Sequence, residues 1–323
     1  MATNIHALIL KHGKDAAKEM VPSKERHLID LASNSMKIDA FDSNDIGFLY
    51  SGWAMTALPH RRPANGREHQ PWTRENGRFR LMVEPGHLYD SKWAIEKAGL
   101  PYGSRARLIL FYLQTEAIRR KSPEVELGSC LRRWLTRMGI SDAGPNYTAV
   151  RDQSRRLSAC RITVGWSSED GTRGFERASI VNRMMFIPAP GLEDRQGVLW
   201  DETARLSPEF YESLVNHPVP VAEQAIRALQ NSSLSMDIYI WLAYRLKTVS
   251  KPMTVSWSAL HQQFGPEYAT VKSFRERFIM NLKEAVCVYP DAHIDISPSG
   301  VILYPSPPAI AERISHKQLS AAD

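Results

Sequence analysis

The sequence is poor in cysteine and contains no long apolar run. Its 323 residues include three cysteines, Cys130, Cys160 and Cys287, which are far apart and odd in number. This usage predicts reduced thiols in a cytoplasm and excludes a C-x-x-C metal site. No apolar stretch approaches the roughly 18–20 residues of a membrane span. The short apolar segment at residues 7–10 has no basic residue before it, so we expect neither a signal peptide nor membrane association.

The common catalytic motifs are missing as well. No two glycines stand two positions apart, which excludes a G-x-G-x-x-G loop, and Gly13-Lys14 follows Leu8 where a P-loop needs its first glycine. There is no H-E-x-x-H, and Gly99 and Gly103 bracket Pro101 rather than the serine of a nucleophile elbow. No histidine stands two positions from another, which argues against a metal-dependent nicking enzyme.

Two acidic clusters remain as candidates for metal chemistry. Asp39, Asp42 and Asp45 form one, and Glu193 and Asp194 form the other. Such clusters are typical of solvated loops and helix caps. We therefore expect a binding protein with no cofactor, no metal and no active site. A nucleic-acid enzyme, either a nickase or a primase with an unrecognised carboxylate site, stays open as an alternative.

The positive charge of the chain is concentrated in one block. The whole sequence has 41 basic and 35 acidic residues, a net charge of +6. Residues 102–161 contain twelve basic and five acidic residues, a net charge of +7, and eleven of the twelve basic residues are arginine. Arginine binds phosphate and guanine edges bidentately, which lysine does not. This block therefore predicts an anionic partner.

Residues 46–200 follow the element order of a winged helix. A basic loop comes first, with six arginines and two glutamates between residues 60 and 80, and an Asn76-Gly77 turn leads into a strand at 78–83. Ser104 predicts the cap of a buried helix that runs to about Lys121. A strand is expected at 125–127, followed by a helix that carries Leu131, Trp134, Leu135 and Met138 and ends at Gly139. The next helix is expected at 147–159, with Val150, Ser154 and Leu157 facing inward and Arg151, Gln153, Arg155 and Arg156 mostly outward. Strands at 161–166 and 178–187, joined by a polar loop at 167–177, complete the unit. In this fold the third helix enters the major groove of DNA, and the hairpin contacts the backbone or the minor groove.

The same order occurs a second time. A buried helix at 236–249 precedes a strand at 253–255, and Tyr147 to Arg151 are echoed by Tyr268 to Lys272 in a helix that continues through Lys283. Strands are expected at 286–289, 294–296 and 301–304. At a constant offset of 126 positions, Trp257, Leu260, Phe264 and Gly265 match Leu131, Trp134, Met138 and Gly139. We interpret this repeat as a duplication, although chance similarity between two small helical units is the alternative.

The predicted fold is α+β, with tandem winged-helix domains behind an N-terminal accessory region. The expected divisions are a helical segment at 1–45, a first winged helix at 46–200, a second at 201–310 and a tail at 311–323. Residues 201–323 contain 11 basic and 13 acidic residues. We therefore expect the first unit to bind DNA more strongly, while the second binds through a local basic stripe or contacts protein.

Several segments resemble the RepA family of bacterial plasmid replication initiators. The resemblance covers roughly residues 45–200 and is carried by the segments Ser51-Gly52-Trp53, Leu58 to Arg61, Pro101 to Leu110, Leu113 to Ala117, Glu124 to Gly128 and Tyr147 to Gln153. It implies a protein that binds repeated double-stranded sites, called iterons, at a plasmid origin. It further implies help in opening that origin, recruitment of the host replication initiator and helicase, and two winged-helix domains in the bacterial cytoplasm.

The candidate DNA-binding residues lie on the third helix of each unit, on the first hairpin and in the basic loop. At the start of the helix at 147–159, we expect base or sugar contacts, and one turn further on we expect contacts to phosphates. Arg173 and Arg177 are placed at the hairpin tip, where a basic residue can enter the minor groove. The full set is Asn146, Tyr147, Thr148, Arg151, Gln153, Arg155, Arg156, Arg173, Arg177, Tyr268, Lys272, Arg275, Arg277, Arg61 and Arg62. For each residue the alternative is an ordinary packed or solvated side chain.

A transcriptional repressor of the same fold, without initiator activity, is a further alternative that the sequence does not separate from an initiator. A homodimer is also possible, and residues 1–45 are a candidate region for controlling it.

Overall fold

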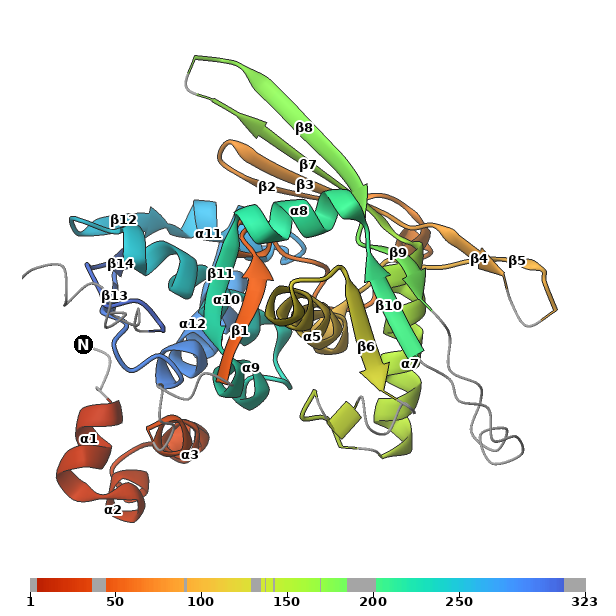
Figure 1. Ribbon diagram of the computed structural model, residues 1–323. Helices are drawn as coiled ribbons and strands as arrows, with labels where there is room; N and C mark the ends of the chain where they lie inside the picture. Colours follow the sequence, from red (N-terminus) through yellow and green to blue (C-terminus); the bar gives the residue numbers. More distant parts are fainter. Residues whose placement is uncertain are drawn as a thin grey trace, which may run out of the picture.

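The computed structural model describes residues 5–36, 45–89, 92–128, 135–136, 138–141, 143–168, 170–184 and 202–310. Helices and strands are mixed along this part of the chain (Figure 1). The predicted α+β class is therefore confirmed. The α-helices are Ile5–His12 (α1), Lys14–Glu19 (α2), Arg26–Ser35 (α3), Gly52–Met55 (α4), Gly103–Arg120 (α5), Gly144–Ala159 (α7), Pro208–Asn216 (α8), Glu223–Ala228 (α9), Ser233–Arg245 (α10), Trp257–Phe264 (α11) and Val271–Cys287 (α12).

The strands form small antiparallel sheets rather than one large sheet. The longest combination has four strands in the order β2-β3-β7-β8, and three-stranded sheets have the orders β6-β10-β9 and β12-β14-β13. Two further pairs are β1-β11 and β4-β5. The strands are Ile46–Tyr50 (β1), Trp72–Asn76 (β2), Phe79–Glu84 (β3), His87–Tyr89 (β4), Ile95–Lys97 (β5), Glu124–Gly128 (β6), Arg161–Ser167 (β7), Arg173–Ser179 (β8), Val181–Met184 (β9), Glu202–Leu206 (β10), Pro218–Ala222 (β11), Met253–Ser256 (β12), Ile294–Ile296 (β13) and Gly300–Leu303 (β14).

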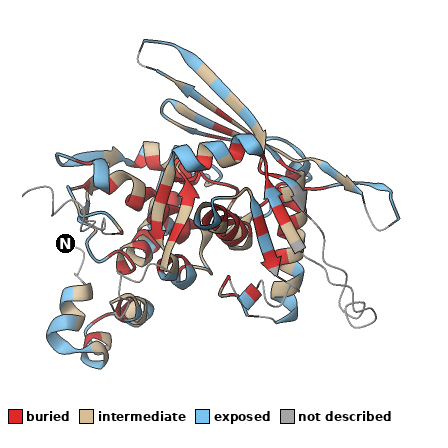
Figure 2. Cartoon of the chain, in the orientation of Figure 1, coloured by how far each residue is buried: buried red, intermediate tan, exposed pale blue. Residues whose placement is uncertain are grey.

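One hydrophobic core holds the body of the molecule together. Buried residues gather along α5, α10 and the β1–β11 pair (Figure 2). The apolar run from Leu108 to Leu113 is buried throughout, as its lack of a polar face predicts. The same core continues from Leu49 in β1 to Leu303 in β14. Because β1 pairs with β11 and β6 pairs with β10, the chain on both sides of position 200 shares sheets as well as core.

The predicted element order is present in the second unit, and the strand pairing differs between the two units. In the second unit the order is α10, β12, α11, α12, β13, β14, and β14 lies between β12 and β13. In the first unit β6 pairs with β10, whereas the β7–β8 hairpin pairs with β3. Leu135 and Met138 are buried and Gly139 has a φ of +70°, consistent with a helix that stops there. Leu131 and Trp134 lie outside the described residues.

Three local predictions are wrong. Ser104 does not cap α5, because the helix starts at Gly103, whose N–H donates to the carbonyl of Pro59 at 2.9 Å. The strand expected at 286–289 is not formed, since its first two residues belong to α12. This helix runs to Cys287 because its buried stripe of Phe274, Phe278 and Leu282 continues at helical spacing.

The third wrong prediction concerns the first hairpin. Its second strand starts at Arg173 rather than at residue 178, because the N–H of Ser168 bonds the carbonyl of Thr172 at 2.8 Å and closes a short turn. From Arg173 onward, exposed and half-buried residues alternate with the period of a strand. The β7–β8 hairpin therefore projects far from the body (Figure 1).

Candidate nucleic-acid interface

Helix α7 is the third helix of the first unit. It starts at Gly144, three residues before the predicted position, with Pro145 in its first turn, and it ends at Ala159 because Cys160 is extended. Val150, Ser154 and Leu157 are buried as predicted. The opposite face, with Thr148 exposed and Arg151 partly exposed, faces solvent.

The first turn of α7 is held in place by polar contacts. The Nη2 of Arg105 donates to Oδ1 of Asn146 at 2.8 Å, and Nδ2 of Asn146 donates to the hydroxyl of Ser141 at 2.7 Å. Tyr147 is half-buried and packs against the core, whereas Thr148 is exposed. Asn146 and Tyr147 therefore fix the start of the helix, and Thr148 is its accessible side chain.

Two arginines on α7 differ in their surroundings. Within the described ranges, the partly exposed guanidinium of Arg151 makes no hydrogen bond and no ion pair, so it is available to a ligand. Arg155 forms an ion pair with Glu96 of β5 and is a quarter exposed. Of the two, Arg151 is the better placed for an anion.

The expected outward orientation of Gln153 and Arg156 is wrong. The guanidinium of Arg156 is buried between Asp152 at 2.9 Å and Glu68 at 3.1 Å, and it also donates to the carbonyl of Leu100. Oε1 of Gln153 accepts from the N–H of Tyr102 at 2.8 Å. These contacts attach α7 to the loop at 98–102, and the helix periodicity did not reveal them because every partner except Asp152 is distant in sequence.

Glu68 is the acidic centre of this attachment. Hydrogen bonds from Arg62 and Arg156 lower the pKa of Glu68 from 4.5 to about 2. Its contribution to stability is therefore present above pH 4.5 and is lost as the pH falls towards 2.

We expect Glu68→Gln to lower the free energy of unfolding at pH 6 by up to about 3 kcal/mol, at 1.36 kcal/mol per pKa unit. The difference from the wild type should shrink below pH 4.5 and vanish near pH 2, which urea unfolding at successive pH values would show. Glu212→Gln, at an exposed position of α8, is the control. A difference that does not change with pH would contradict the assignment.

The β7–β8 hairpin carries the two predicted wing residues at different places. Arg173 is the first residue of β8 and lies next to the turn, opposite Ser167. Arg177 lies in the middle of the strand, opposite Thr163, and its Nε donates to the Thr163 hydroxyl at 3.2 Å. The tip position predicted for Arg177 is wrong because the strand starts earlier than expected.

Helix α12 is the third helix of the second unit. It begins at Val271, where the hydroxyl of Thr270 accepts from the N–H of Ser273 at 3.1 Å. Lys272 and Arg277 are exposed, and Arg275 lies over the ring of Trp257 at 4.9 Å. Tyr268 precedes the helix, and its ring packs against Phe274.

A groove of about 670 Å³ lies between the basic loop and the segment that leads into α12. Arg61, Arg62 and Arg67 line one side, and Tyr268 lines the other. Deeper in the groove, Arg74 is buried and bonds Glu267 at 2.7 Å. The sequence placed this loop with the first unit, yet the structure brings it beside the second, about 200 residues away.

A buried ion pair holds the start of the loop that lines the groove. Arg107 of α5 donates twice to Asp237 of α10, each time at 2.6 Å, and both side chains are less than a tenth exposed. Arg107 also donates to the carbonyls of Leu58 and Pro59, which fixes the start of the basic loop. Burial and the Arg107 charge hold the pKa of His60 well below its usual range. The sequence did not identify this cluster, although a charged residue at 237 inside an apolar helix was a usable signal.

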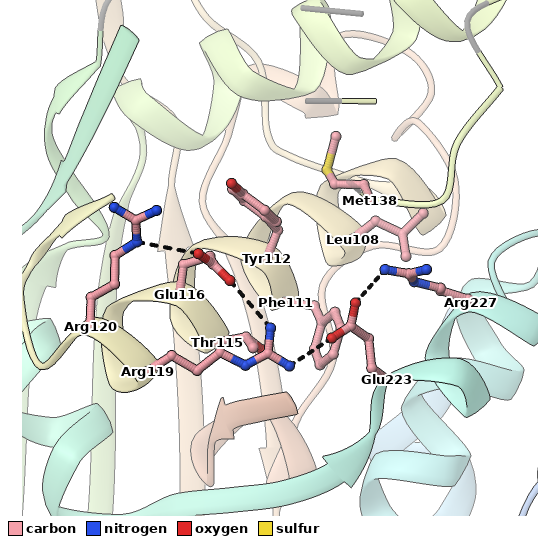
Figure 3. A pocket seen from close by; sticks show the side chains of 10 residues that line it. All are labelled: Leu108, Phe111, Tyr112, Thr115, Glu116, Arg119, Arg120, Met138, Glu223 and Arg227. Carbon is pink, nitrogen blue, oxygen red and sulfur yellow. Dashed lines mark hydrogen bonds and ion pairs between the residues drawn. The ribbon is translucent and has the colours of Figure 1, made fainter. Parts of the chain in front are cut away.

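A second cavity, of about 280 Å³, lies between α5 and α9 (Figure 3). Its charged residues form a chain of ion pairs from Arg120 through Glu116, Arg119 and Glu223 to Arg227, at 3.4, 3.3, 2.8 and 2.5 Å. Each of these charges has a partner within the chain. The arrangement joins the two helices rather than presenting a charge to a ligand.

The described residues hold no group of three or more His, Cys, Asp or Glu side chains that could bind a metal. Within the same residues, no helix has the length and apolar character of a membrane span. Cys160 and Cys287 are free and buried, and burial raises the pKa of each thiol to about 12. Cys130 lies outside the described residues.

Residues 100–259 match the family model RepA_C, described as the plasmid encoded RepA protein. This central region belongs to the RepA family. The resemblance predicted from the sequence is thus confirmed, and the RepA match extends past residue 200, through α10 and into α11 of the second unit.

Two solved structures of RctB are similar to the chain. The selenomethionine derivatives of domains 2 and 3 of RctB share 17% identity, with a TM-score of 0.46, over 73% of this chain and 84% of that chain. The structure of RctB domains 2–3, residues 155–483, shares 15% identity, with a TM-score of 0.44, over 78% of this chain and 94% of that chain. No curated protein matches the RepA-like chain.

Proposed function

We propose that this protein is a plasmid replication initiator that binds repeated double-stranded DNA sites at the plasmid origin. The observation that carries the proposal is the RepA match over residues 100–259, which runs from the loop that holds α7 to α11 of the second unit. In this proposal the protein is not an enzyme. It helps to open the origin and recruits the host replication initiator and helicase.

The two units act as winged-helix domains in this proposal. Helix α7 enters the major groove with Thr148 and Arg151 towards the bases, and α12 presents Lys272 and Arg277. The β7–β8 hairpin reaches the neighbouring backbone or minor groove with Arg173. The divisions near residues 45, 200 and 310 are part of the same proposal.

The predicted contacts fall into different roles once their surroundings are known. We assign base readout to Thr148 and Arg151 and phosphate contact to Arg155, Arg61 and Arg62, which are at least partly exposed. Asn146, Tyr147 and Tyr268 position the ends of the helices. Gln153 and Arg156 are left out of the interface because their side chains are buried and hydrogen-bonded. Arg275 and Arg177 flank it.

The N-terminal helices are the proposed place of control over a homodimer. Leu28 and Ala32 of α3 pack against Cys287 at the end of α12. A change in this packing would therefore be transmitted to α12. Deleting residues 1–40 tests the proposal by the solution mass and DNA affinity, and both would stay unchanged if the segment has no such role.

The test of function is a binding titration on the intergenic DNA beside the gene, against random duplex, at two salt concentrations. Tight binding in a ladder over direct repeats supports the proposal. The logarithm of the binding constant should then fall with the logarithm of the salt concentration, with a slope of about 0.9 per phosphate contact. Origin melting and helicase recruitment then separate an initiator from a repressor. Weak binding without sequence preference contradicts the proposal, and metal-dependent strand cleavage would indicate a nickase.

Arg151→Ala should cost about 1–3 kcal/mol in binding to the repeat and relax the specificity at one base pair. Arg155→Ala, one turn further along the same helix, should weaken binding to all sequences alike. Competition titrations against repeats with single base changes would measure both effects. If the two variants act equally on specific and random DNA, the division between base and phosphate contacts is wrong.

A further inference from the structure

The sheet β2-β3-β7-β8 has a basic outer face. Strand alternation puts Arg80 of β3, Arg161 of β7 and Arg173 and Arg177 of β8 on this face, all exposed. The acidic residues on it are Glu75 and Glu84, so arginine is in excess. The inner face instead contacts the body, through the Glu176–Ser213 and Arg74–Glu267 hydrogen bonds.

A gap in the side chains interrupts this outer face at Gly165. The strand register places Gly165 opposite Arg80 on one side and Phe175 on the other. A Cβ at Gly165 would meet only the carbonyl oxygen of Gly174 at 3.8 Å and the Cβ of Arg80 at 3.9 Å. The space above the glycine is therefore open, and the residues that flank it on the same face are Phe175 of β8 and Arg80 of β3.

The neighbouring glycine on the inner face is different. Gly174 lies opposite Trp166, and a Cβ there would meet the indole at 2.6 Å. The tryptophan thus covers its glycine, whereas Phe175 is 74% exposed and leaves Gly165 uncovered. Arg80 is also accessible: among the described residues its side chain forms an exposed ion pair with Glu75 of β2 at 3.4 Å, on the side away from Gly165, and so weak a pair leaves the guanidinium able to turn towards the gap.

The spacing of the strands leaves room for one flat ring. The backbones of β3 and β8 are two strand spacings apart, about 9–10 Å. A base stacked between Phe175 and the guanidinium of Arg80 needs about 7 Å between these two groups, twice the roughly 3.4 Å spacing of stacked bases. Aromatic side chains and arginine both stack on unpaired bases, whatever the base.

We propose that Phe175, Gly165 and Arg80 form a stacking site for one unpaired base of single-stranded DNA. Arg173 and Arg177 lie two residues to either side of Phe175 on the same face, so they can contact the phosphates that flank the stacked base. A paired base cannot enter, because both of its faces are already stacked in the duplex. The site goes beyond duplex recognition by α7 and α12 and does not depend on it.

The experiment measures binding of the full chain to oligo-dT that carries one 2-aminopurine, by anisotropy and by quenching of the 2-aminopurine. Phe175→Ala should weaken binding by about tenfold or more and abolish the quenching, in line with the energy of base–aromatic stacking. Gly165→Val places a side chain from β7 in the gap and should act in the same way, and Phe175→Tyr should retain binding. Tyr89→Ala removes an exposed aromatic from the other hairpin and should change nothing.

The duplex titration on repeats is run with the same variants and should be unaltered, so failure of this site and failure of the proposed function are distinguishable. Circular dichroism checks that each variant is folded. Unchanged oligo-dT affinity in both Phe175→Ala and Gly165→Val would overturn the proposal, as would an equal loss in Tyr89→Ala. Tighter binding to oligo-rU than to oligo-dT would overturn the assignment to DNA.

Discussion

Asp237→Ala is expected to lower the free energy of unfolding by about 3–5 kcal/mol, the cost of leaving a buried charge without its partner. Arg107 would keep its guanidinium in the core while losing two hydrogen bonds of 2.6 Å. Because the same guanidinium bonds the carbonyls of Leu58 and Pro59, the basic loop should loosen as well. Urea unfolding followed by tryptophan fluorescence measures the first effect, and proteolysis between residues 58 and 70 measures the second.

Two controls separate charge burial from general damage. The double variant Arg107→Met/Asp237→Leu removes both charges and should recover much of the loss, as replacement of buried ion pairs by apolar residues often does. Arg119→Ala, in a more exposed ion-pair chain, should cost less than Asp237→Ala. If Asp237→Ala destabilises no more than Arg119→Ala, the pair does not organise the core.

The second large effect is expected at the groove between the basic loop and α12. The triple variant Arg61→Gln/Arg67→Gln/Lys272→Gln removes three exposed positive charges. If these side chains contact phosphates, the slope of the logarithm of the DNA-binding constant against the logarithm of the salt concentration should become shallower by about 2.7, at about 0.9 per contact. At about 1.5 kcal/mol or more for each charged hydrogen bond, affinity should fall on the order of a thousandfold for specific and random duplex alike.

A triple variant with the same loss of charge serves as the control. Lys11→Gln/Lys14→Gln/Lys18→Gln changes helices α1 and α2, away from the groove (Figure 1). It should leave the salt dependence close to that of the wild type. An equal change in both variants would mean that only net charge matters and that the groove is not part of the DNA surface.

The positions of the main helices and strands could be predicted from local patterns. The apolar runs inside α5 and α10 indicated buried helices, and Asn76-Gly77 indicated the turn between β2 and β3. These signals are local, because a turn or a buried face depends on residues a few positions apart. The errors at Ser104 and in α12 arose where a tertiary contact or a longer helix replaced the local preference.

The candidate site was harder to predict because its charges find partners elsewhere in the chain. The basic block at 102–161 suggested a free positive surface, yet Arg107, Arg119, Arg155 and Arg156 are paired with Asp237, Glu223, Glu96 and Glu68. All four of these acidic partners lie outside the block. Composition within a window therefore overstated the available charge, and only the fold identifies Arg151 as accessible.

The groove beside α12 and the gap at Gly165 had no sequence signal at all. The first joins residues about 200 positions apart, and the second depends on the register of three strands. A shift of one residue in that register would move Phe175 or Arg80 to the other face of the sheet.

The shared core and the β1–β11 pairing have a consequence for the length of the DNA target. Helices α7 and α12 belong to units that are joined by two sheets and by the Arg107–Asp237 pair, so the two helices cannot move independently of each other. The fixed distance between the two helices therefore fixes the spacing of the DNA segments that they can contact together. If both helices contact the duplex, the two contacted segments must keep one helical phase, and an insertion of half a turn between them would let only one helix reach its groove.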